Sequence, residues 1–174
     1  VSVDGGNRWE NRSNGLATNM FYDVDVAQTD VRFFGGGAQD NGTIRTTDGR
    51  ADTFVEIDGG DGGWIVIDPN EADHVYTSSQ FGAITRLRNG HRRNVSPPFR
   101  EEDSGGMWMV YVTIDPNDSD TVYTGNQRVY RTQNDGLSWD ALTPVLDGSP
   151  ISAIEVAPAD SNAIYVGTEN GGIF

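Results

Sequence analysis

The feature that most constrains the fold of this chain is an internal repeat. Ile-Asp-Pro-Asn at 67–70, followed by His-Val-Tyr-Thr at 74–77, recurs as Ile-Asp-Pro-Asn at 114–117, followed by Thr-Val-Tyr-Thr at 121–124. A third copy lies at 156–166 and a worn copy at 24–34, where Val-Asp-Val-Ala replaces Ile-Asp-Pro-Asn. Pro fixes φ and Asn tolerates turn geometry, so each copy predicts a strand, a turn and a second strand. The period of about 42 to 47 residues is the length of a four-stranded propeller blade.

The repeat therefore predicts an all-β fold, a β-propeller of four-stranded antiparallel blades. About four blades fit in the chain, as a single propeller domain or as a fragment of a larger propeller. The 22 glycines and the lack of long amphipathic stretches support short strands joined by tight turns. The expected blades are 19–62, 63–105, 106–150, and 151–174 completed by 1–18. In the best-defined blade we expect strands at 108–114, 122–125, 128–132 and 138–142.

The two ends of the chain fall in the same strand of the repeat. Phe174 aligns with Tyr130 and Val1 aligns with Arg131. Joined end to end, they would continue one strand, the third of a blade. The ring could close in this way within one chain, or a second copy or a missing segment could complete the array. Self-association through the split ends of this third strand is therefore one expectation, because an unpaired strand edge promotes association.

A second motif marks the turn between the third and fourth strands. Thr132, Asn134, Gly136 and Trp139 fit the pattern [ST]-x-[DN]-x-G-x-x-W, and residues 2–9 fit it at identical spacing. The Asp or Asn accepts amides of its own turn, the Gly supplies a left-handed conformation, and the Trp packs between sheets. The copy at 46–50 is eroded and the turn at 88–91 lacks the motif. This mixture indicates a structural device rather than a catalytic one.

Charge and composition exclude several classes of function. The formal charge of −14 repels phosphates and anionic membrane surfaces, so we expect neither nucleic-acid binding nor membrane insertion. No apolar run is long enough for a membrane span. There is no cysteine, and His74 and His91 have no metal-site spacing, so no metal site is predicted from them. Nucleotide-binding and Ser-His-Asp signatures are also absent.

The propeller topology sorts polar residues onto two edges. With strands A to D numbered in chain order, the B–C turns and D–A loops share one edge, and this edge is the expected ligand face. Carboxylates, amides and an aromatic side chain there suit a glycan or protein ligand. The candidate ligand-binding residues are Gln39, Asp40, Asn41, Asp61, Trp64, Gln80, Glu101, Asn126, Gln127 and Glu169.

Simpler structural roles compete at each position. Residues 39–42 could be only a B–C turn, and 101–103 only a solvated charge run. Asp58 and Asp61 could offer oxygens to Ca²⁺, although Ca²⁺ takes six or more ligands and a flexible glycine-rich loop is the alternative. Trp64 could pack between blades.

The repeats resemble a known group of proteins. The motif at 132–139 resembles the Asp box, or bacterial neuraminidase repeat. Together with the Ile-Asp-Pro-Asn turns and the segment 36–42, it resembles sortilin-like and xyloglucanase-like propellers, and bacterial glycosyl hydrolases with this repeat. The resemblance implies a multibladed propeller, extracellular or at the cell surface, within a longer protein. It carries no activity across, because fold-level analogy does not specify chemistry.

Three functions from different classes remain open. The first is a propeller module that binds a glycan or protein on the B–C and D–A edge. The second is a fragment of a glycoside hydrolase that draws its acid and base from Asp40, Asp61 and Glu101, which lie on successive loops. The third is a structural or assembly propeller.

Overall fold

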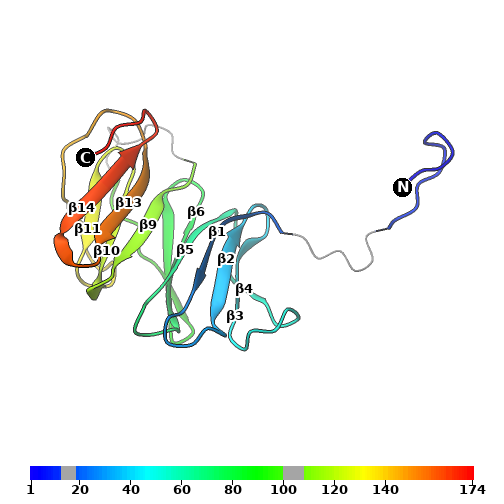
Figure 1. Cartoon of the computed structure of the whole chain (residues 1–174), viewed down its shortest axis with the longest axis horizontal. Helices are drawn as coiled ribbons and strands as arrows, with labels where there is room; N and C mark the ends of the chain where they lie inside the picture. Colours follow the sequence, from blue (N-terminus) through cyan, green and yellow to red (C-terminus); the bar gives the residue numbers. More distant parts are fainter. Residues whose placement is uncertain (13–18, 100–107) are drawn as a thin grey trace.

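The computed structural model describes residues 1–12, 19–99 and 108–174. The chain folds into four antiparallel sheets that stand side by side in an arc and do not close into a ring (Figure 1). The predicted all-β propeller architecture of about four blades is confirmed. Within the described part of the chain, no helix is long and apolar enough to cross a membrane.

Each of the first three blades is a sheet whose strands follow chain order. Blade I holds β1 (Phe21–Val26), β2 (Phe34–Ala38), β3 (Gly42–Thr46) and β4 (Val55–Asp58). Blade II holds β5 (Gly62–Ile67), β6 (His74–Ser79), β7 (Ala83–Arg88) and β8 (His91–Asn94). Blade III holds β9 (Tyr111–Asp115), β10 (Asp118–Gly125), β11 (Val129–Thr132) and β12 (Asp140–Ala141). Blade IV holds β13 (Ile151–Ala157) and β14 (Asp160–Thr168).

The core lies between consecutive blades rather than within them, because each sheet buries a face against each neighbouring sheet. Three clusters of buried side chains fill the three seams. The I–II seam holds Ala27, Ile57, Ile65, Ile67, Val75 and Leu87. The II–III seam holds Tyr76, Ile84, Val95, Val110, Val112, Ile114 and Val122. The III–IV seam holds Tyr123, Val129, Ile151, Ile154, Val156 and Val166.

The A–B turn of blade I lies two residues later than the letter match at 24–34 predicts. In blade II the Asp68 amide donates to the His74 carbonyl at 2.9 Å, and in blade I the corresponding bond joins Ala27 to Phe33 at 2.8 Å. Ala27 therefore occupies the place of Asp68. The correction moves Asp25 out of the turn and into strand β1.

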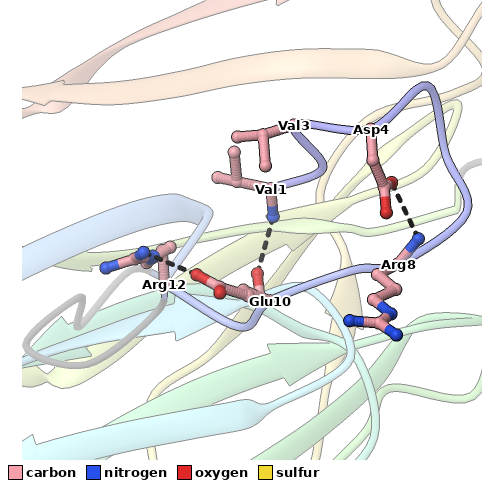
Figure 2. Close-up of a pocket in the computed structure, with 6 residues that line it drawn as sticks. All are labelled: Val1, Val3, Asp4, Arg8, Glu10 and Arg12. Atoms are coloured by element: carbon pink, nitrogen blue, oxygen red, sulfur yellow. Dashed lines mark hydrogen bonds and ion pairs between the residues drawn. The ribbon is translucent and has the colours of Figure 1, made fainter.

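The two segments that fit the eight-residue turn motif share one hydrogen-bond pattern. The Gly136 amide donates to the Thr132 hydroxyl at 3.0 Å, and the Ser138 amide donates to Asn134 Oδ1 at 2.9 Å. In residues 1–12 the Gly6 amide makes the equivalent bond to the Ser2 hydroxyl at 2.8 Å. The Arg8 amide makes the second one, to Asp4 Oδ1 at 2.9 Å (Figure 2). The two turns thus share the same amide bonds, although the predicted packing of the motif Trp between sheets does not hold for Trp9.

The two motif tryptophans have different surroundings. Trp139 packs against the II–III core, and its indole N–H donates to the Val95 carbonyl at 2.7 Å. Trp9 is 75% exposed. Its segment closes on itself through reciprocal backbone bonds between Val1 and Glu10 (Figure 2). The segment lies away from the four sheets (Figure 1).

The third strand of blade IV begins at the last residues of the chain. Phe174 exchanges two 3.0 Å backbone hydrogen bonds with Val166, as the alignment of Phe174 with Tyr130 requires. In Figure 1 the N-terminus lies at the far end of the molecule from the C-terminus. The completion of blade IV by residues 1–18, and pairing of these ends between copies, stay predictions; residues 13–18 lie outside the described part.

Candidate ligand-binding edge

The B–C turns and D–A loops form one edge of the blades, called here the ligand edge (residues 39–41, 59–61, 80–81, 126–127 and 169). Antiparallel strand order places these connections together and puts the A–B and C–D turns at the other end. The candidate residues fall into two groups on this edge. One lies across the I–II seam and the other across the III–IV seam.

Hydrogen bonds join three consecutive connections across the I–II seam. The Asp40 amide donates to Asp61 Oδ1 at 2.8 Å, and the Asp61 amide donates to Gln80 Oε1 at 2.8 Å. A backbone bond from Gly42 to the Gly60 carbonyl, at 2.9 Å, runs alongside. The turn at Asp40, the loop at Asp61 and the turn at Gln80 therefore form one connected polar row.

The Asp40 turn holds its carboxylate outward. Asp40 has a φ of 61°, which a non-glycine residue adopts at a cost, and Gly42 follows with a φ of 68°. Asp40 is exposed, and among the described residues its carboxylate accepts no hydrogen bond. The neighbouring Gln39 Oε1 accepts a bond from the Tyr22 hydroxyl at 3.1 Å. Asn41 braces the turn by donating from its amide side chain to the Gln39 carbonyl at 2.9 Å.

An exposed aromatic pair continues the row beyond Gln80. Phe81 and Trp108 meet edge to face, with ring centroids 5.0 Å apart, and are 79% and 48% exposed. The Phe81 amide donates to the Trp108 carbonyl at 2.9 Å, so backbone as well as ring contacts fix the pair. Phe81 has a φ of 65°, which is unusual for a bulky residue and turns its ring outward from the turn. The propeller topology places both residues at this edge, although neither is among the ten candidate ligand-binding residues.

The predicted Trp64 lies deeper than this pair. Its half-buried ring packs on Tyr111 of blade III with centroids 5.3 Å apart, and its backbone amide donates to the Ser78 hydroxyl at 2.9 Å. Trp64 thus packs between blades, as its structural alternative anticipates, and supports the row from the inner side.

The second group is separate from the first. Asn126 is only 8% exposed, so its side chain is inside the seam. Gln127 donates from its side-chain amide to the Gly148 carbonyl at 2.9 Å, and Glu169 is exposed, with its backbone amide bonded to the Pro150 carbonyl at 2.9 Å. Glu101 lies outside the described residues. The I–II group therefore presents the larger accessible set.

The Asp58 side chain links blade I to blade II across the I–II seam. It accepts bonds from the Thr77 hydroxyl at 2.7 Å and from the Gly59 amide at 3.1 Å, and it forms an ion pair with Arg92 of blade II. A guanidinium thus already holds this carboxylate, and Ca²⁺ at Asp58 and Asp61 stays a prediction.

One cluster in the described part of the chain has the composition of a metal site: Asp68, Glu71 and His74. Both oxygens of Asp68, one oxygen of Glu71 and His74 Nδ1 have partners within the protein. Asp68 Oδ1 accepts the Asn70 amide at 2.7 Å, Asp68 Oδ2 lies 2.9 Å from His74 Nδ1, and Glu71 Oε2 lies 2.6 Å from Arg88. The cluster sits at the A–B turn, away from the ligand edge, where it fixes the turn.

Burial perturbs carboxyls on the inner side of the I–II seam. Desolvation raises the pKa of Asp23 and of Asp25 above their usual value, partly offset by the hydrogen bonds that they accept from blade II. Tyr111 nearby has a raised pKa because of burial and then because of the charges of Glu155 and Asp23. No sequence pattern singled out Asp23 or Asp25, because the letter match assigned Asp25 to a turn.

Comparison with solved structures supports the fold. The chain superimposes on an ancestral GH74 enzyme with a TM-score of 0.64 and 18% identity, and on the GH74 xyloglucanase from Xanthomonas campestris with a TM-score of 0.65 and 16% identity. The matches cover 88% and 86% of this chain but only 25% and 27% of those chains. At these identities the likeness shows the fold alone. No protein-family model matches the sequence, and none of the curated proteins does.

Proposed function

We propose that this chain is a glycan-binding propeller module whose ligand edge spans the I–II seam. The observation that carries the proposal is the connected row of Asp40, Asp61 and Gln80 next to the exposed Phe81–Trp108 pair. Sugars present hydroxyl groups to carboxylates and amides, and apolar C–H faces to aromatic rings. A fixed row that offers both therefore suits a saccharide.

The fold comparison supports the same class of ligand. Both GH74 structures have the fold of this chain, and the one from Xanthomonas campestris is a xyloglucanase. We also propose that this chain derives from Asp-box propellers of the sortilin-like and xyloglucanase-like kind. We propose that it acts outside the cell or at its surface. The shared hydrogen-bond pattern of the two motif turns supports the Asp-box assignment.

Affinity electrophoresis through gels that contain soluble β-glucans, xylans, mannans or pectins tests the proposal. We expect at least one polysaccharide to retard the wild-type protein. The double substitution Phe81→Ala and Trp108→Ala should weaken that binding by about 10- to 100-fold, as loss of two aromatic anchors does elsewhere. Asp120→Asn, on the opposite edge, is the control and should bind as the wild type does. A panel without retardation, or equal retardation of all three proteins, contradicts the proposal.

The alternative function is glycoside hydrolysis by a pair of loop carboxylates. One observation favours it, because the 2.8 Å bond from the Asp40 amide to Asp61 Oδ1 brings two carboxyl-bearing residues from different connections side by side. Hydrolysis needs one group to protonate the leaving oxygen and a second to act as base or nucleophile.

If the chain is a hydrolase, Asp40→Asn should abolish release of reducing ends from the bound polysaccharide while leaving retardation within about threefold of wild type. This outcome would separate chemistry from binding. Release of reducing ends by Asp40→Asn at the wild-type rate rules this role out, and no release by the wild type leaves the binding function alone.

A further inference from the structure

Strand register shows that blade I differs from the others on the inner side of its seam. Val26 pairs with Phe34, and the same A–B register position holds Ile67–Val75, Ile114–Val122 and Val156–Ile164. Two equivalent sites in each innermost strand lie three residues and one residue before this position. In blades I to IV the first site holds Asp23, Trp64, Tyr111 and Ala153, and the second holds Asp25, Val66, Thr113 and Glu155.

The two carboxylates of blade I bridge the seam to blade II. The Ile65 amide donates to Asp23 Oδ2 at 3.1 Å, and the Ile67 amide donates to Asp25 Oδ2 at 2.7 Å. Strand β5 is the edge strand of its sheet, so these amides have no neighbouring strand to pair with on that side. Asp23 and Asp25 thus replace a missing strand partner and fasten the innermost strands of two blades together.

No cation balances these carboxylates in the described part of the chain. Every ion pair found there leaves out both Asp23 and Asp25. Of the strands packed on β1, neither β2 nor β5 carries an ionisable side chain. The titratable groups that face the pair are the two carboxyls themselves and Tyr111 of blade III, which in turn faces Glu155 of blade IV.

We propose that Asp23 and Asp25 hold blades I and II together most strongly when their carboxyls are protonated. The order of the ligand edge then depends on pH. Loss of a proton places uncompensated charge in a partly buried seam, whereas a protonated carboxyl still offers its carbonyl oxygen to the β5 amide. The Asp40–Asp61 bond crosses the same seam at the ligand edge, so a looser seam also loosens the polar row.

The direction of the pH dependence follows from the raised pKa of both groups. A carboxyl with a higher pKa in the folded state contributes stability that is fully present below its unfolded value of 3.8 and is lost as pH rises through the folded value. Hydrogen bonds lower the pKa of four other carboxyls below 3.8, namely Asp4, Asp30, Asp48 and Asp147. Their stabilisation is lost as pH falls, which is the opposite direction to that of Asp23 and Asp25.

Urea unfolding of the full chain from pH 4.5 to 7.5 tests the inference. The wild-type folding constant should fall across this range, and the double variant Asp23→Asn, Asp25→Asn should reverse much of that fall. At pH 7 we expect a severalfold larger folding constant for the double variant, because each amide keeps an acceptor oxygen without a buried charge. Glu155→Gln is the matched control. It removes one charge from the position equivalent to Asp25, where the side chain is exposed.

A second readout separates the seam from the overall charge. Hydrogen exchange of the Asp40 amide, corrected for intrinsic rates, should show protection that falls from pH 5 to pH 7 in the wild type and stays level in the double variant. The inference is overturned if the double variant keeps the wild-type pH slope in both measurements. It is equally overturned if Glu155→Gln reproduces the gain, since general relief of negative charge then explains it.

Discussion

Replacing Trp139 by Ala should lower the free energy of unfolding by about 3 kcal/mol. The indole of Trp139 packs on the core of the II–III seam and donates its N–H to the Val95 carbonyl at 2.7 Å. Truncation therefore removes apolar contacts between two blades and leaves a carbonyl without its donor. Urea unfolding followed by far-ultraviolet circular dichroism measures the change.

Trp9 is the matched control, because it occupies the same motif position in residues 1–12. It is 75% exposed, so Trp9→Ala should change the free energy of unfolding by no more than about 0.5 kcal/mol. Equal losses for the two variants would show that the motif Trp acts within its own turn rather than between blades.

Replacing Asp135 by Asn should cost about 2–3 kcal/mol, because this side chain joins the two blades electrostatically. Asp135 belongs to the C–D turn of blade III and reaches Arg86 and Arg88 of blade II at 2.8 and 3.0 Å. It also accepts a bond from the buried Tyr76 hydroxyl at 3.3 Å. Asn has nearly the same shape and tolerates the φ of 59° at this residue, so the substitution tests the charge.

Asp52→Asn provides the control for Asp135→Asn. Asp52 pairs with Arg50 at 2.9 Å, but both side chains are about two-thirds exposed, and such pairs contribute little. We expect a loss below about 0.5 kcal/mol, which salt should abolish. A loss for Asp135→Asn that is equally small would contradict an electrostatic link between blades II and III.

The repeat made the blades predictable, because a turn with Pro and Asn ends a strand wherever it occurs. In blade III the expected strands 108–114, 122–125, 128–132 and 138–142 match β9 to β12 in order, with boundaries shifted by a few residues at most. Blade I lacks those turn residues. There the letters of Val24 to Ala27 resembled a turn, whereas cross-strand pairing places the turn at Ala27.

This shift of two residues hid the function of Asp25. The letter match placed Asp25 in the A–B turn rather than in β1, so its bond across the seam to the Ile67 amide was not predicted. The sequence placed Asp40, Asp61 and Gln80 on one edge from topology alone, and the structure joins them by hydrogen bonds. Topology also places Phe81 and Trp108 at this edge, but their ring contact was not predicted, because the two residues come from different connections.

We propose that the ligand binds at the edge opposite the motif turns, and hydrogen exchange tests this proposal most directly. The measurement compares the free chain with the chain saturated by the polysaccharide that retards it most in the electrophoretic panel. We predict slower exchange at 39–42, 59–64 and 80–82, with no change at the A–B turns 68–73 and 115–120. Protection confined to those A–B turns, or absent from all of these segments, would contradict the assignment of the ligand edge.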